Sequence, residues 1–148
     1  MSIQPTKISH LGICVSDWDR SLRFYTEVLG FEIDHFAVQD IDAPFEKLVE
    51  FEEMKWRGVI LARQGFIIEL MHYEIPACIG DGERRPMNKL GITHFSFHVD
   101  DIDAMIDRIV EYGGKVHPQT RMSGKHGQFV FCTDPDGIRL ELWQKPAA

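Results

Sequence analysis

The sequence has few cysteines and no excess of basic charge. Its three cysteines are Cys14, Cys78 and Cys132. An odd number without a Cys-x-x-Cys pair does not indicate a disulfide framework, so a reducing compartment is the simpler expectation. The formal net charge of −7 argues against a nucleic-acid surface or a basic membrane anchor, and we expect no nucleic acid as a partner.

Long apolar runs are absent as well. No stretch approaches the roughly 20 residues that a membrane-spanning helix needs, and residues 1–7 lack the apolar core of a signal peptide. We therefore expect a soluble, cytoplasmic protein that does not associate with membranes. With 148 residues, 44% of them hydrophobic, the chain can form one domain or two small fused modules.

An internal repeat is the main feature that is present. Ile8-Ser9-His10 recurs as Ile92-Thr93-His94, and Glu69-Leu70 recurs as Glu141-Leu142 in the same order. The first half carries about 12 extra residues between its histidine and its glutamate. We assign these to the acidic segment from Asp40 to Met54. The sequence thus predicts two copies of one structural module.

Each half follows the element order βαβββ. Alternating apolar and polar residues predict first strands at 8–15 and 92–99, and Asp17 and Asp101 would cap the helices that follow. Three more strands are expected in each half, at 31–38, 56–63 and 66–73, and at 115–117, 128–133 and 138–144. A turn is expected at 134–137 and a short helix at 45–51. The predicted class is α+β in one domain, residues 1–148, with modules at about 7–75 and 91–145 and a linker over 76–90.

Two histidines and two glutamates at equivalent repeat positions form a candidate metal-ligand set: His10, Glu69, His94 and Glu141. Both glutamates have large apolar neighbours, and a charged carboxylate there is costly unless it is paired or coordinated. Imidazole and carboxylate suit Zn, Ni, Co, Mn or Fe, and four ligands in an octahedral shell leave two positions for water or substrate. Taken singly, each residue is more often an ordinary strand residue, so the repeat carries the interpretation.

Residues that share strand faces with these four are expected to line a substrate pocket, since side chains alternate along a strand. They are Cys14, Met71, Tyr73, His98, Arg139 and Trp143. The histidines without a repeat partner are expected on the surface or in loops: His35, His72, His117 and His126. Glu83-Arg84-Arg85 is most simply a solvated charge cluster, and a contact to a phosphate or carboxylate is the alternative.

The segments 10–17, 21–31 and 133–142 resemble the vicinal oxygen chelate superfamily (glyoxalase, bleomycin resistance and extradiol dioxygenase proteins), and the resemblance extends over residues 7–144. It implies two βαβββ modules forming a curved, barrel-like mixed sheet around a divalent metal, with ligands at His10, Glu69, His94 and Glu141. It also implies a homodimer, in which the site lies within one chain or across the two chains.

The resemblance implies a divalent-metal-dependent enzyme that catalyses proton transfer next to a carbonyl of a small molecule. It would be a glyoxalase I-like lyase or a methylmalonyl-CoA epimerase-like isomerase, in which Glu69 and Glu141 are catalytic, one of them as base and the other as acid. Cys14 and Tyr73 stand where bacterial glyoxalases hold glutathione with arginine and asparagine, and Glu69 stands where epimerases commonly have glutamine. The alternatives are an Fe(II)-dependent extradiol-type dioxygenase, which needs two histidines and one glutamate, and a non-catalytic small-molecule (antibiotic) binding protein.

Overall fold

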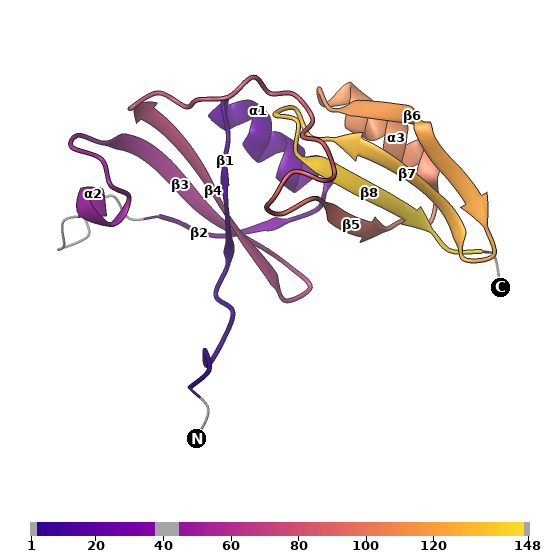
Figure 1. Ribbon diagram of the computed structural model, residues 1–148, viewed down its shortest axis with the longest axis horizontal. Coiled ribbons are helices and arrows are strands. Elements are labelled where there is room, and N and C mark those ends of the chain that lie inside the picture. Colours follow the sequence, from indigo (N-terminus) through magenta and orange to yellow (C-terminus); the bar gives the residue numbers. More distant parts are fainter. Residues whose placement is uncertain (1–2, 38–44, 147–148) are drawn as a thin grey trace. The chain divides into compact units, whose positions relative to one another are not determined.

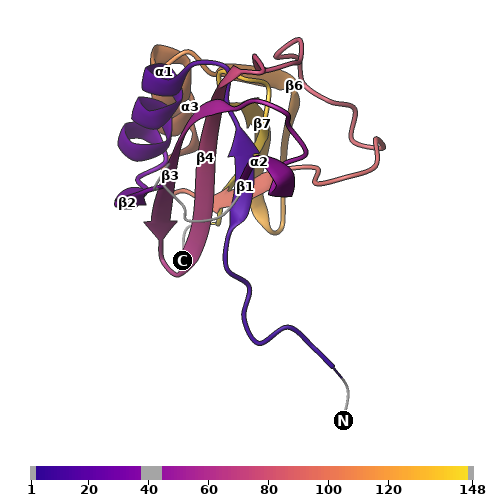
Figure 2. The same cartoon turned by 90° about the vertical axis from the view of Figure 1, so that its left-hand side faces the viewer.

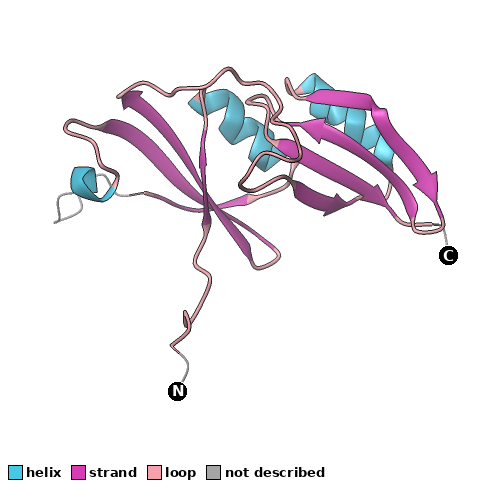
Figure 3. Ribbon diagram, viewed as in Figure 1, coloured by secondary structure: helices cyan, strands magenta, loops and turns pink. Residues whose placement is uncertain are grey.

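The computed structural model describes residues 3–37 and 45–146, and its chain divides into two compact units, Met1–Ile79 and Gly80–Ala148. The boundary falls inside the segment 76–90 that the sequence predicts as a linker. Each unit contains one βαβββ copy (Figures 1 and 3). The two units are therefore the two predicted modules.

The first unit folds into a four-stranded mixed sheet. Its elements are β1 (Leu11–Cys14), α1 (Trp18–Arg23), a π-helical continuation η1 (Phe24–Val28), β2 (Glu32–Phe36), α2 (Phe45–Leu48), β3 (Lys55–Arg63) and β4 (Phe66–Ile75). The strand order is β1-β4-β3-β2. β1 runs parallel to β4, and the other neighbours are antiparallel.

The helices of the first unit contact opposite faces of this sheet. Asp17 caps α1 by accepting a hydrogen bond from the backbone N–H of Arg20 at 2.9 Å. Phe24 and Tyr25 of the continuation η1 are fully buried, as are the strand residues Ile68 and Leu70. The ring of Phe45 in α2 stacks on Trp56, on the other face, and Figure 2 shows α1 and α2 on either side of the strands. Glu69 alternates with Ile68 and Leu70 and so belongs to the face opposite α1.

The second unit repeats this plan. It contains β5 (Phe95–His98), α3 (Ile102–Glu111), β6 (Lys115–Gly124), β7 (Gly127–Thr133) and β8 (Arg139–Gln144), in the sheet order β5-β8-β7-β6. Its core joins Ile102 and Ile109 of α3 to fully buried strand residues, Val130, Cys132, Leu140 and Leu142. Glu141 alternates with these leucines and pairs in register with Ser96 and Phe131, so all three side chains belong to the face opposite α3.

The predicted fold class is confirmed: the chain is α+β and contains two βαβββ modules, each an open mixed sheet. The predicted helix in the extra segment is present as α2. The part of that segment from Asp40 to Pro44, with Val38 and Gln39 before it, lies outside the described residues.

The starts of β1 and β5 and the end of β6 are among the boundaries that differ from the prediction. β1 and β5 begin just after His10 and His94, because the parallel pairing starts at Leu11 with Ile68 and at Phe95 with Leu140. β6 continues to Gly124, past the expected end at residue 117, with an irregularity in its pairing after His117. Over the described residues, no helix has the length and apolar character needed to cross a membrane.

Candidate metal centre

His10 and Glu69 come together in the first unit. His10 directly precedes β1, and Glu69 lies on the neighbouring β4. The His10 Nε2 is 3.2 Å from Glu69 Oε2, with the imidazole more exposed than the carboxylate (39% against 16%). The other ring nitrogen, Nδ1, is 3.0 Å from the hydroxyl of Ser9. This contact leaves Nε2 directed at the carboxylate.

His94 and Glu141 form the corresponding pair in the second unit. His94 directly precedes β5, and Glu141 lies on the adjacent β8. The His94 Nε2 is 3.8 Å from Glu141 Oε2, and both side chains are about one quarter exposed (28% and 24%). The His94 Nδ1 is 2.9 Å from the hydroxyl of Thr93. The order of hydroxyl, imidazole and carboxylate in the first unit therefore recurs in the second.

The hydroxyl before each histidine is a feature that the sequence prediction did not single out. A hydrogen bond at one ring nitrogen fixes the orientation of the imidazole and leaves the other nitrogen for a ligand. Ser9 and Thr93 both lie in the repeated tripeptide, so the repeat itself carried the signal. Both copies of the repeat have a hydroxyl residue directly before the candidate histidine ligand. This pattern could have revealed the contact between the hydroxyl and the histidine ring.

The two glutamates differ in one contact. Ser96 donates a hydrogen bond from its hydroxyl to Glu141 Oε2 at 2.6 Å. In the first unit the residue paired in register with Glu69 is Gly12, which has no side chain to offer. Glu141 is therefore held from two sides, and Glu69 from one.

The predicted pocket residues of the first unit gather around Glu69. Tyr73 donates a hydrogen bond from its hydroxyl to Met71 Sδ at 3.5 Å, and its ring stacks on Trp56. Burial raises the pKa of the Tyr73 phenol, with Cys14, Glu69 and Cys78 adding to the rise. The Cys14 thiol is exposed and lies 3.6 Å from the Cys78 thiol. Cys14, Met71 and Tyr73 thus occur together, as the alternation of the strands predicts.

In the second unit, the predicted pocket residues follow the same face of β5 and β8. His98 and Trp143 are register partners with ring centroids 4.5 Å apart. Trp143 donates a hydrogen bond from Nε1 to the carbonyl of His126 at 2.8 Å. Arg139 starts β8 and is only 6% exposed. Its guanidinium lies 5.0 Å from the ring centroid of Phe131.

Two expectations about histidines were wrong. His72 lies within β4, where its Nδ1 is 3.0 Å from the carbonyl oxygen of Val15, and His117 lies within β6. Both are half-buried strand residues, not surface or loop residues. A residue without a repeat partner can still occupy an interior position when one module packs differently from the other, and the repeat cannot show this.

The chemistry of each pair suits a divalent ion, since imidazole and carboxylate are common ligands of Zn, Ni, Co, Mn and Fe. Neither unit completes a site alone: within the described residues, no group of three or more His, Cys, Asp or Glu side chains that could hold a metal is present. Two donors leave about half of a tetrahedral shell, or about two thirds of an octahedral one, empty. The residues therefore fit half a metal site in each module.

Paired βαβββ modules with a repeated His–Glu pair define a class of protein, and the comparisons agree with it. The chain belongs to the Glyoxalase/Bleomycin resistance protein/Dioxygenase superfamily, whose model matches residues 7–142. The resemblance to the vicinal oxygen chelate superfamily is thereby confirmed.

Individual relatives cover nearly the whole chain. A probable lactoylglutathione lyase of Synechocystis is 32% identical over 139 residues, which are 91% of this chain and 92% of that protein. A 2-epi-5-epi-valiolone epimerase of Actinomyces is 29% identical over 150 residues, 95% of this chain and 80% of that protein. The crystal structure of a glyoxalase family protein from Bacillus cereus matches with a TM-score of 0.82 at 20% identity, covering 98% and 97% of the chains. That likeness concerns the fold alone.

Proposed function

We propose that this chain is a divalent-metal-dependent enzyme that moves a proton next to a carbonyl group, as a lyase or an epimerase. The observation that carries the proposal is the duplicated His–Glu pair, in which a hydroxyl holds each histidine with Nε2 directed at the carboxylate. The relatives named above include a lactoylglutathione lyase and an epimerase, which are the two activities left open.

In this proposal, one ion takes all four ligands: His10, Glu69, His94 and Glu141. Each module offers two donors, and four donors leave two positions of an octahedral shell for substrate oxygens. The two pairs would come from one chain or from two chains of a homodimer. When bound, the ion would act as a Lewis acid that polarises the substrate carbonyl.

The difference between the glutamates assigns their roles. Ser96 holds the Glu141 carboxylate in place, whereas the register partner of Glu69 is a glycine. We therefore assign the base to Glu69, which accepts the proton from the carbon next to the carbonyl at a carboxylate oxygen. We assign Glu141 the role of the acid, which donates a proton to the substrate. Tyr73 and Met71 would exclude water beside Glu69, since both are half-buried.

The first experiment uses elemental mass spectrometry to measure the metal bound to protein that was purified without chelator. We expect about one divalent ion per chain, with much less in His10→Ala and in His94→Ala. His35→Ala is the matched control, because the His35 side chain is exposed and its ring nitrogen pairs with the Asp34 carboxylate at 2.6 Å, away from Glu69 and Glu141 in sequence. Wild-type protein that holds no metal after titration with Zn, Ni, Co, Mn and Fe(II) would contradict the proposal.

The second experiment follows solvent deuterium into a panel of hydroxy-ketones, hemithioacetals and acyl-CoA thioesters. Proton transfer by Glu69 should exchange the proton next to the carbonyl, and Glu69→Gln should slow the exchange by about 10²- to 10⁴-fold. Glutamine keeps a side-chain oxygen for the metal, so the metal content of this variant separates loss of the base from loss of the ion. Protein and substrate are also mixed without oxygen and then exposed to air. Oxygen uptake at that point would indicate a dioxygenase instead.

A further inference from the structure

The second unit contains a cluster of cationic side chains that the proposed proton transfer does not use. Only 6% of Arg139 is exposed. Its Nη2 donates a hydrogen bond to the backbone carbonyl of Arg85 at 2.6 Å. Neither Arg84 nor Arg85 nor Arg139 forms an ion pair with a carboxylate among the described residues. A buried guanidinium without a counter-charge is costly.

The surroundings of the cluster are positive as well. The Nη1 of Arg84 and the Nε2 of His117 are buried and have no hydrogen-bond partner among the described residues. Burial lowers the pKa of His117, and Arg84, Arg139 and Lys115 lower it further, while Glu83 opposes them. Burial and Arg84 likewise lower the pKa of Arg139. Arg84, Arg139 and Lys115 are therefore within electrostatic reach of His117. The unused polar atoms are Arg84 Nη1 and His117 Nε2, whereas Arg139 and Arg85 each donate to a backbone carbonyl, that of Arg85 and that of Leu90.

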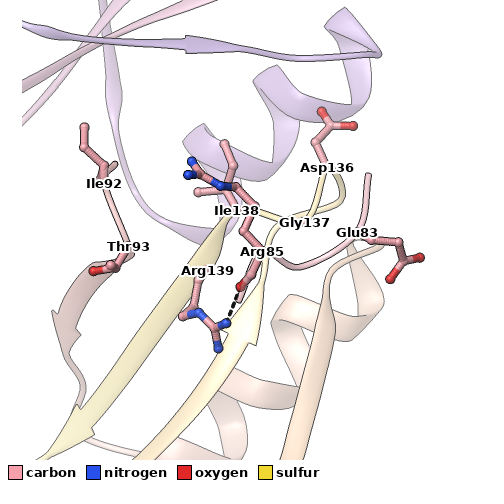
Figure 4. A pocket seen from close by; sticks show the side chains of 8 residues that line it. All are labelled: Glu83, Arg85, Ile92, Thr93, Asp136, Gly137, Ile138 and Arg139. Atoms are coloured by element: carbon pink, nitrogen blue, oxygen red, sulfur yellow. Dashed lines mark hydrogen bonds between the residues drawn. The ribbon is translucent and has the colours of Figure 1, made fainter. Parts of the chain in front are cut away.

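A cavity adjoins the cluster. Its volume is about 130 Å³, enough for several water molecules or a small polar group. Eight residues line it (Figure 4): Glu83, Arg85, Ile92, Thr93, Asp136, Gly137, Ile138 and Arg139. Figure 4 shows the carboxylates of Glu83 and Asp136 turned away from the Arg139 guanidinium, and Glu83 lies 3.5 Å from the Lys115 ammonium instead.

The cavity lies beside the candidate ligands of this unit. Thr93 lines it, and the Thr93 hydroxyl is 2.9 Å from Nδ1 of His94. Arg139 lies two positions before Glu141 on β8 and so belongs to the same face of the sheet. A group bound between Arg85 and Arg139 would therefore be a neighbour of the His94–Glu141 pair.

From these observations we propose that the cavity lined by Arg85 and Arg139 is an anion subsite, which binds a carboxylate or phosphate group. Guanidinium groups bind both kinds of anion through paired hydrogen bonds. A substrate of the proposed enzyme would carry that anionic group beside its reacting carbonyl, and this inference about the substrate rests on the proposed function. For Glu83-Arg84-Arg85, this proposal favours a contact to a phosphate or carboxylate over the solvated charge cluster that is the simplest interpretation of the sequence.

The binding test uses the full chain and two probes, inorganic phosphate and acetate, titrated separately at constant ionic strength. The readouts are the melting temperature and the amide NMR shifts of Thr93 and Gly137. We expect saturable stabilisation with at least one probe and local shifts at both amides. The probe that binds more tightly indicates whether the natural group is a phosphate or a carboxylate.

Variants decide whether the cavity is responsible. Arg85→Gln and Arg84→Gln should weaken binding by about tenfold, the usual effect of losing a hydrogen bond to a charged group. Arg108→Gln removes the same charge from α3 and should bind as the wild type does. Arg139 is buried, so Arg139→Lys serves as the conservative variant and should lose affinity while remaining folded. Equal affinity in Arg84→Gln, Arg85→Gln and Arg108→Gln, or an unsaturable response in the wild type, would overturn the subsite.

Failure of the subsite and failure of the enzyme proposal can be told apart. Anion binding should persist in Glu69→Gln and in metal-free protein, because no ligand of the metal takes part in it. If the enzyme proposal holds, Arg85→Gln should raise KM for anionic substrates by about tenfold with little change in kcat. Neutral analogues of the same substrates should show no such difference between the two proteins.

Discussion

Ser96 and Gly12 occupy equivalent positions in the two modules, and this difference distinguishes the two glutamates. Ser96 donates a hydrogen bond to Glu141 at 2.6 Å. Gly12 offers Glu69 nothing, and a Cβ at that position would lie 2.8 Å from Met71 Cε. The sequence repeat predicted both glutamates as ligands and could not rank them, because the ranking depends on which side chain stands opposite each one in the sheet.

Ser96→Ala tests this difference. Removing the hydroxyl frees the Glu141 carboxylate, and we expect kcat/KM to fall by about three- to tenfold, as for an exposed hydrogen bond to a charged group. The bound metal should remain, since the ligand itself is unchanged. Ser123→Ala, at an exposed position of β6, is the control and should leave kcat/KM unaltered. A variant that loses metal together with activity would show instead that Ser96 supports the ligand set.

The three cysteines should differ sharply in reactivity. Cys14 is exposed and lies 3.6 Å from Cys78, whereas burial raises the pKa of Cys132 to about 11. Hydrogen peroxide should therefore convert the Cys14 and Cys78 thiols to a disulfide, with two molecules of water as the reduced product, and leave Cys132 as a thiol. Peptide mapping by mass spectrometry measures both outcomes.

Cys78→Ser is the matched variant for this experiment. It should form no Cys14–Cys78 disulfide, and peroxide should convert the Cys14 thiol to a sulfenic acid with one molecule of water as the reduced product. Oxidation of Cys132 as fast as that of Cys14, or failure of the wild type to link Cys14 to Cys78, would contradict the expected order.

At the scale of the elements, β6 shows what periodicity misses. The sequence predicted a strand of residues 115–117 only. The next residue, Pro118, has no backbone N–H to donate to a ladder. The structure bridges the interruption with Thr120, whose hydroxyl donates to the carbonyl of His117 at 2.6 Å and accepts from the N–H of Phe131 at 2.9 Å. A side chain thus replaces the missing ladder contact, and the strand resumes to Gly124.

The turn before β8 was predictable, and its environment was not. Asp134 accepts hydrogen bonds from the N–H groups of Asp136 and Ile138, as an Asp-Pro-Asp-Gly turn indicates. Gly137 has φ +83°, and a Cβ there would lie 2.5 Å from the backbone oxygen of Gly82. The segment predicted as a loose linker therefore packs directly on this turn, which places Arg85 at the cavity.

Gly137→Ala should accordingly lower the free energy of unfolding by more than backbone strain alone would. We expect the free energy of unfolding to fall by roughly 1–3 kcal/mol from the positive φ alone, with a further loss because the clash is with backbone. Displacing residues 82–83 should also weaken phosphate or acetate binding. Gly124→Ala is the control, since a Cβ there meets nothing within 4 Å. Urea unfolding measures the stability, and equal midpoints for the two variants would contradict the packing argument.

At the scale of the whole molecule, duplication made most of the fold predictable. Two copies of one pattern identified both modules, their faces and their His–Glu pairs from residue types alone. The half-buried Arg84 and His117 of the second module were not predictable in this way, because neither has a counterpart of its type in the first. A repeat reveals what two copies share, and features of one copy need the packed structure.

The proposed site divides its ligands equally between the modules, so metal binding should depend on both. We expect a chelator to lower the melting temperature of the wild type, because an ion that binds only the folded state stabilises it by mass action. His10→Ala and His94→Ala lie in different units, and each should abolish the response to the chelator. His35→Ala should retain it. Loss in one histidine variant alone would indicate a site confined to that module.

Mixing the two inactive variants distinguishes a site within one chain from a site across a homodimer. If the ligands come from two chains, a mixed dimer of His10→Ala and His94→Ala contains one site with both histidines intact. Refolding equal amounts of the variants together should then restore about one quarter of the metal and of the exchange activity of the same amount of wild type, because about half of the dimers are mixed and each mixed dimer has one of its two sites intact. If one chain supplies all four ligands, every site in the mixture lacks a histidine, and neither metal nor activity returns.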